Sequence, residues 1–126
     1  MTAFAAIAAT IVLGLLAVFQ LALVAGAPLG HFAWGGQSRV LPTRLRIGSV
    51  VSIVVYALIA AVLLERAGLV RLFGDPEFVQ VTAWVVFAYF ALGILLNAIS
   101  RSKPERYTMV PVTIVLAALS LLVALG

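Results

Sequence analysis

The stretch TAFAAIAATIVLGLLAVFQLALVA, residues 2–25, carries no charged side chain and decides the fold class of this 126-residue chain. Its length is close to the ~20 residues that an α-helix needs to cross a ~30 Å hydrocarbon core. Three further apolar runs of similar length follow, at residues 45–64, 78–99 and 107–125. The sequence therefore predicts an all-α fold, a transmembrane four-helix bundle that forms a single domain over residues 1–126.

The composition indicates that lipid, not water, covers most of this chain. Apolar residues make up 65% and charged residues 10%, against about 45–50% and 25% in soluble domains. A soluble protein of 13.3 kDa has too little interior to bury so much apolar surface. The absence of cysteine excludes disulfides and thiolate metal sites. Residues 1–25 lack the positive start of a signal peptide, so we expect this run to be retained as the first span.

The basic residues predict the orientation in the membrane. Six of the eight lie in or beside the first loop, residues 26–44 (loop one), and the third loop, residues 100–106: Arg39, Arg44, Arg46, Arg101, Lys103 and Arg106. The positive-inside rule then places both loops in the cytoplasm and both termini outside. Their expected partners are anionic lipid headgroups, at about 1 kcal/mol per basic residue. Because these basic residues flank the spans, we attribute the net charge of +4 to membrane contact and expect no nucleic acid partner.

Glycine and proline predict the helix ends. Gly26 followed by Pro28 ends the first helix, because Gly accepts the left-handed cap conformation and Pro cannot continue the helix. Gly68 ends the second helix in the same way. Asp75 and Pro76 start the third helix, as an N-cap and as the first helical residue.

A weak internal repeat relates the starts of the second and fourth spans. Pro42-Thr43-Arg44-Leu45 resembles Pro104-Glu105-Arg106-Tyr107, 62 positions later, and each precedes an apolar run. The two halves of the chain could then be parallel helical-hairpin repeats, an arrangement found in transporters, or share Pro and Arg only for local reasons. We expect Pro104 to start the fourth helix and Pro111 to lie in or near its first turn, where it costs little.

Five polar side chains within the spans lie in the half of the bilayer next to loops one and three. They are Gln20, Ser49, Ser52, Asn97 and Thr113. They predict either a polar vestibule open to the cytoplasm or helix–helix hydrogen bonds of roughly 0.6–2 kcal/mol each. Gln20 is expected to face protein, because an amide in hydrocarbon lacks partners. The spans hold no Asp or Glu in their interiors, where proton-coupled carriers usually need one.

His31 and Trp34, both in loop one, are expected at the headgroup level, where aromatic side chains are enriched. A single histidine cannot build a multi-histidine metal site or a bis-histidine haem site. No catalytic, metal-ligating or cofactor-binding set of residues emerges from the sequence. Loop one is long for a helical hairpin, and it is apolar and rich in Gly. We therefore expect it to be ordered and packed against the bundle or the headgroup layer.

Loop one also carries a resemblance. Its elements Gly26-Ala27-Pro28, Ala33-Trp34-Gly35-Gly36-Gln37 and Leu41-Pro42, followed by Leu45-Arg46, resemble an uncharacterised family of small bacterial four-span membrane proteins. The segment 101–107 is similar as well, so that the resemblance covers the whole chain. It implies a protein of the bacterial inner membrane, and it implies no activity.

Three functions remain open on the sequence alone. The first is a non-enzymatic oligomeric scaffold or accessory subunit of a larger membrane complex, favoured by the lack of catalytic constellations and by small residues that allow close helix contact, such as Ala9, Gly14 and Ala57. The second is a homo-oligomeric transporter or channel for a small molecule or ion that uses the polar vestibule. The third is a lipid- or quinone-binding enzyme subunit that uses His31 and the arginines.

Overall fold

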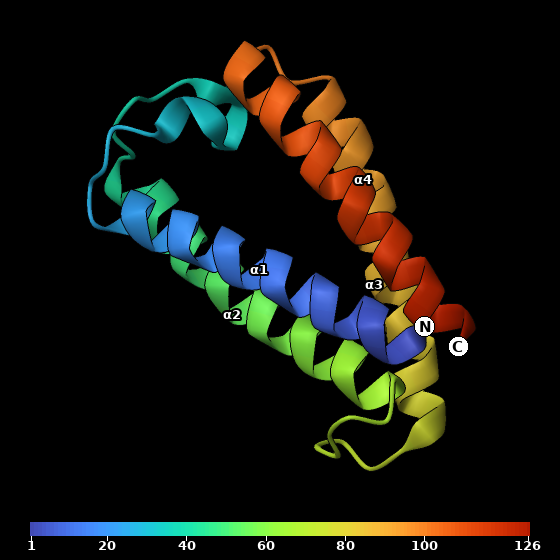
Figure 1. Cartoon of the computed structure of the whole chain (residues 1–126). Helices are drawn as coiled ribbons and strands as arrows, with labels where there is room; N and C mark the ends of the chain where they lie inside the picture. The colour runs from blue at the N-terminus through green and yellow to red at the C-terminus, as the bar shows by residue number, and fades with distance from the viewer.

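The computed structural model describes residues 1–126 as four long α-helices and two short 3₁₀ turns (Figure 1). The helices are α1 (Thr2–Val24), α2 (Thr43–Arg66), α3 (Pro76–Ala98) and α4 (Lys103–Leu125). The 3₁₀ turns, η1 (Gly30–Phe32) and η2 (Trp34–Gly36), lie in loop one. All four helices are long and apolar enough to cross a membrane. The predicted all-α four-helix bundle is confirmed, and the chain is an integral membrane protein.

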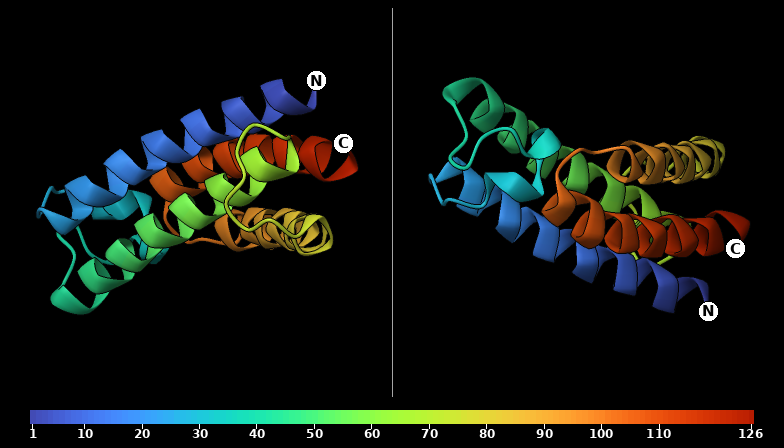
Figure 2. Two further views of the ribbon diagram at one scale, coloured as in Figure 1. Left: turned by 90° about the horizontal axis from the view of Figure 1, so that it is seen from below. Right: turned by 90° about the horizontal axis from the view of Figure 1, so that it is seen from above.

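The helices pair as two antiparallel hairpins, α1 with α2 and α3 with α4 (Figures 1 and 2). The hairpins converge at the end of the bundle where both termini lie, and they diverge toward loop one. Loop one crosses this open end and contacts α4 through η1 and η2. We call the two ends of the bundle the terminal end and the loop-one end. The expectation that loop one packs against the bundle is confirmed.

Small side chains allow the hairpins to meet at the terminal end. Ala5, Ala6 and Ala9 of α1 have no exposed surface and belong to one core with residues of the other three helices. Leu63 of α2 and Val123 of α4 are also fully buried in this core. Because lipid gives no hydrophobic drive between helices, close contact of small residues supplies dispersion attraction instead. The packing therefore holds one end of the bundle closed.

The predicted helix ends at glycine and aspartate are confirmed. Gly26 and Gly68 adopt φ angles of +95° and +80°, just beyond the last residues of α1 and α2. The Asp75 carboxylate accepts hydrogen bonds from the backbone N–H groups of Glu77 at 3.0 Å and Phe78 at 3.3 Å, and Pro76 is the first residue of α3. Local chemistry thus sets these boundaries independently of the bundle.

The prediction for Pro111 is wrong. The fourth helix begins at Lys103, because Ser102 acts as its N-cap and Pro104 fits its first turn. Pro111 therefore lies inside α4 and not in its first turn. It has no N–H to donate to the carbonyl of Tyr107, one helical turn earlier, so α4 lacks one backbone hydrogen bond there.

Candidate functional site

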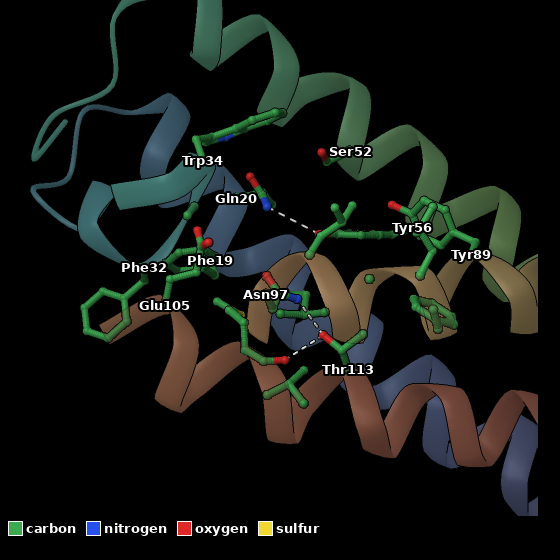
Figure 3. Close-up of a pocket in the computed structure, with 18 residues that line it drawn as sticks. Phe19, Gln20, Phe32, Trp34, Ser52, Tyr56, Tyr89, Asn97, Glu105 and Thr113 are labelled. Carbon is green, nitrogen blue, oxygen red and sulfur yellow. Dashed lines mark hydrogen bonds between the residues drawn. The ribbon is translucent and has the colours of Figure 1, made fainter. Parts of the chain in front are cut away.

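A pocket of about 260 Å³ lies between the two hairpins near the loop-one end (Figure 3). All four helices and loop one contribute to its wall. Its polar lining consists of Gln20, Ser52, Tyr56, Asn97, Glu105 and Thr113. Its aromatic lining includes Phe19, Phe32, Trp34, Tyr89 and Phe90. An apolar and aromatic cavity with a few convergent polar groups is typical of a small-molecule site.

Gln20 projects from α1 into this pocket and is only 7% exposed. Its Nε2 donates to the hydroxyl of Tyr56 on α2 at 3.3 Å. Its Oε1 is buried and has no hydrogen-bond partner. Whichever way the amide is turned, Tyr56 engages only one of its two polar atoms, and the other stays free. The expectation that Gln20 faces protein is confirmed, and its amide is only half satisfied.

Asn97 and Thr113 form the corresponding pair in the second hairpin. The Nδ2 of Asn97 on α3 donates to the Oγ1 of Thr113 on α4 at 2.9 Å, and Thr113 in turn donates to the carbonyl of Met109. Gly93 makes room for this approach, because a Cβ at that position would lie 3.1 Å from the Thr113 methyl group. The pair therefore ties α3 to α4, as the Gln20–Tyr56 pair ties α1 to α2.

The two polar pairs face the pocket without bonding to each other. Each hydrogen bond stays within its own hairpin. Ser52 likewise donates within α2, to the carbonyl of Gly48 at 3.0 Å. The polar groups at this level thus stabilise each hairpin separately, and none of these bonds closes the gap between the hairpins. The space between them is bounded by polar atoms that still have hydrogen-bonding capacity.

Loop one closes the pocket from the loop-one end. The backbone N–H of Gly35 donates to Oε2 of Glu105 on α4 at 3.1 Å, and the Ser102 hydroxyl donates to the carbonyl of His31. On the other side, Trp34 Nε1 donates to the Ser49 hydroxyl on α2 at 3.2 Å. Loop one is therefore tied to both hairpins and forms a strap across their open end.

The structure brings together four of the five polar residues that we expected in a vestibule: Gln20, Ser52, Asn97 and Thr113. Ser49 is not part of the pocket wall. It is fully buried, and its hydroxyl accepts the bond from the Trp34 indole. Gly48 allows this contact, because a Cβ there would lie 2.8 Å from the indole ring. Trp34 accordingly reaches inward to α2 and lines the pocket, with 41% of its surface exposed.

His31 lies outside the pocket. Its side chain is exposed, and its Nδ1 lies 2.9 Å from the carbonyl of Gly36. This contact closes the short turn between η1 and η2 and helps to shape the strap.

Glu105 is a charged pocket residue that the sequence does not predict there, and Tyr56 and Tyr89 are two further unpredicted members of the wall. Charged residues lie near Glu105 in the sequence, which predicts a solvated side chain, yet Glu105 is only 6% exposed. The spacing of Ser102 and Glu105 matches a capping box, in which the glutamate would bond back to the N-cap backbone. The serine part of that motif is formed, since Ser102 Oγ accepts from the Glu105 N–H at 3.5 Å. The carboxylate instead reaches loop one.

The six basic residues surround the loop-one end in two groups. Four are exposed: Arg39, Arg44, Arg101 and Lys103. Arg46 and Arg106 are half-buried, and both bond to backbone carbonyls. Arg46 Nε donates to Leu41 O at 2.8 Å, and Arg106 Nη1 donates to Ser100 O at 3.1 Å. None of the six lines the pocket.

Comparisons with known proteins do not add to this description. No protein family matches the chain, and neither curated proteins nor solved structures show a match.

Proposed function

We propose that this protein binds a small amphipathic molecule in the pocket between its two hairpins. The observation that supports this most directly is the Gln20 amide, which faces the cavity with one polar atom unpaired. An unsatisfied buried polar group costs about 1–3 kcal/mol. A ligand that supplies the missing hydrogen bond recovers this free energy.

The proposed orientation places the loop-one end in the cytoplasm and both termini outside. Six basic residues at this end, against Arg66 and Arg71 at the other, support this assignment through the positive-inside rule. The pocket then lies in the cytoplasmic half of the inner membrane of a bacterial cell. A ligand would reach it from the cytoplasmic leaflet, under the strap formed by loop one.

Trp34 makes ligand binding measurable, because its indole lines the pocket. The only other tryptophan, Trp84, does not line it and can be replaced by Phe. We would reconstitute Trp84→Phe protein in phosphatidylcholine nanodiscs and titrate dodecyl amphiphiles with neutral, anionic and cationic heads. At least one should change the Trp34 emission saturably.

Gln20→Leu then tests the role of the amide. It should weaken the saturable change while helix content is retained. The matched control is Thr82→Val, because Thr82 bonds only to its own helix, at Phe78 O, and lies away from the pocket. The proposed function fails if no amphiphile changes the Trp34 emission, or if Gln20→Leu and Thr82→Val leave binding equally intact.

Transport of the bound ligand would extend this function, in line with the transporter alternative that the sequence left open. Four helices seldom enclose a pathway alone, so a transporter would be a homo-oligomer. Flux of a bound amphiphile or ion across proteoliposomes that is lost in Gln20→Leu, with the oligomer preserved, would support it. Binding without flux assigns the protein a storage, sensing or delivery role.

The second candidate function is an oligomeric scaffold or accessory subunit. Gly14 and Ala57, small residues expected at helix contacts, are exposed on α1 and α2 instead of packed within the bundle. A Cβ added at Gly14 would meet nothing within 4 Å. A neighbouring helix could approach these positions closely. Gly14→Ile and Ala57→Ile should then reduce self-association, measured by crosslinking in membranes, without changing ligand binding.

A further inference from the structure

A second cavity adjoins the pocket on the lipid-facing side of the bundle. It is a groove of about 460 Å³ between α1 and α4. Both spaces are lined by Leu16, Phe19, Met109 and Val112, so they are adjacent. Seven of its nine lining residues are hydrophobic. A molecule that occupied both spaces would need a polar part and a hydrocarbon part.

The groove leads away from the loop-one end toward the middle of the bundle. On α1 it runs from Phe19 back to Val12, and on α4 from Thr108 forward to Val115. At 1.5 Å per residue, each stretch is about 10 Å long. A lipid of the same leaflet has its head near the headgroup level and its chain pointing to the bilayer centre. The pocket with its polar wall likewise lies near the loop-one end, and the groove with its apolar wall runs toward the middle of the bundle.

Glu105 indicates the charge of the head. The residue is only 6% exposed, and its Oε2 accepts one hydrogen bond, from Gly35 N–H. The half-buried Arg46 and Arg106 donate to backbone carbonyls elsewhere. A buried carboxylate is costly unless a cation compensates it. Because the cations of the chain at this end bond elsewhere or are exposed, a cationic ligand would supply the compensation.

The surroundings of Glu105 fit an ammonium group. Trp34, Phe32 and Phe19 line the same part of the pocket, as Figure 3 shows. Aromatic faces attract organic cations, most strongly where water is excluded. In the orientation in which Gln20 Nε2 donates to Tyr56, Gln20 Oε1 supplies a further hydrogen-bond acceptor without a partner. An anionic head would be repelled by the Glu105 carboxylate, and a neutral alcohol would leave the charge of that carboxylate uncompensated.

We infer that the ligand is a single-chain amphiphile with an ammonium head, which lies between Glu105, Gln20 and the aromatic side chains, while its tail occupies the groove between α1 and α4. This inference rests on the proposed function and names the ligand class of the same pocket. The strap of loop one covers the head, and the pocket and the groove are adjacent, so that one molecule can occupy both.

The test compares four probes in the nanodisc titration with Trp84→Phe protein: dodecylammonium, dodecan-1-ol, dodecanoate and butylammonium. Dodecylammonium should saturate the Trp34 signal at a concentration at least about tenfold below that of dodecan-1-ol, as expected for a desolvated charge pair. Dodecanoate and butylammonium should bind more weakly still, since one has the wrong charge and the other lacks a tail. Partitioning into protein-free nanodiscs is subtracted for each probe.

Glu105→Gln removes the charge and keeps an oxygen that accepts the Gly35 hydrogen bond. This variant should raise the dodecylammonium concentration at the midpoint of the Trp34 titration to that of dodecan-1-ol. Glu77→Gln, an equal charge change in an exposed residue at the terminal end, should leave this midpoint unchanged.

Val115→Phe narrows the groove alone and should weaken the binding of every dodecyl probe severalfold, whereas Val85→Phe on the outer face of α3 should not. Circular dichroism checks the fold, and Gln20→Leu offers a second variant that should weaken dodecylammonium binding.

The outcomes separate this inference from the function on which it rests. Equal binding of dodecylammonium and dodecan-1-ol, with no effect of Glu105→Gln, overturns the ammonium head and leaves the pocket as a ligand site. Undiminished dodecyl binding in Val115→Phe overturns the groove as the site of the tail. If no probe changes the Trp34 emission, the proposed function itself fails.

Discussion

Gly35 and Glu105, seventy positions apart in sequence, are joined by a hydrogen bond of 3.1 Å from the Gly35 backbone N–H to the Glu105 carboxylate. This bond ties the strap of loop one to α4 above the pocket. Glu105 also lines the pocket, so the same residue holds the strap and gives the pocket its charge.

Gly36→Ala should detach the strap from α4. Gly36 has a φ of +72°, which costs a residue with a Cβ about 1–2 kcal/mol, and its Cβ would overlap the Ser102 side chain. Gly35→Ala is the matched control, since its φ is +77° but its Cβ would meet nothing within 4 Å. Hydrogen exchange of residues 30–36 should accelerate much more in Gly36→Ala. Equal acceleration in both variants would show that backbone strain alone matters.

The Asn97–Thr113 hydrogen bond should stabilise the second hairpin measurably. A double-mutant cycle with Asn97→Leu and Thr113→Val should give a coupling free energy of about 0.6 kcal/mol, and at most about 1.7 kcal/mol. Reversible unfolding in mixed micelles provides the measurement. Ser52→Ala serves as the control partner for Asn97→Leu, because Ser52 bonds within α2, and its coupling to Asn97 should be near zero. Equal couplings in the two cycles would contradict the pairing.

Ala9→Leu should loosen the terminal end of the bundle. Ala9 is fully buried in the core shared by the hairpins, and overpacking of such a site costs typically about 1–3 kcal/mol. Ala88→Leu adds the same atoms to an exposed position on α3 and should change stability little. The free energies of unfolding of both variants test this. A similar loss in the two variants would mean that the hairpins do not converge at Ala9.

Single cysteines should report the orientation directly, because the chain has none of its own. Gln37→Cys in loop one and Leu72→Cys between α2 and α3 both replace exposed, uncharged residues. In intact cells, a membrane-impermeant maleimide should label Leu72→Cys and spare Gln37→Cys until the membrane is opened. The reverse pattern would invert the proposed topology and place the pocket in the outer half of the bilayer.

Local patterns were enough to predict the helices and most of their ends. Four uncharged or nearly uncharged runs have the length of a membrane span, and glycine, aspartate and proline act through bonds to their immediate neighbours. The prediction is wrong at Pro111 for a local reason as well: the three charges within residues 103–106 favour a loop, although Ser102 caps a helix there. The sequence also predicts that Gln20 faces protein, because an amide in lipid lacks hydrogen-bond partners.

Hydropathy and helix capping depend on neighbouring residues, and they are therefore enough to predict a four-helix membrane protein with five polar side chains toward one end. The arrangement of the helices in space is needed to find that the Ser49 hydroxyl accepts the hydrogen bond of Trp34, that Tyr56 and Tyr89 line the pocket, and that Glu105 is buried. These facts depend on how the hairpins diverge and where loop one crosses between them. Side chains far apart in the chain meet only through the relative placement of rigid helices, which no local pattern encodes.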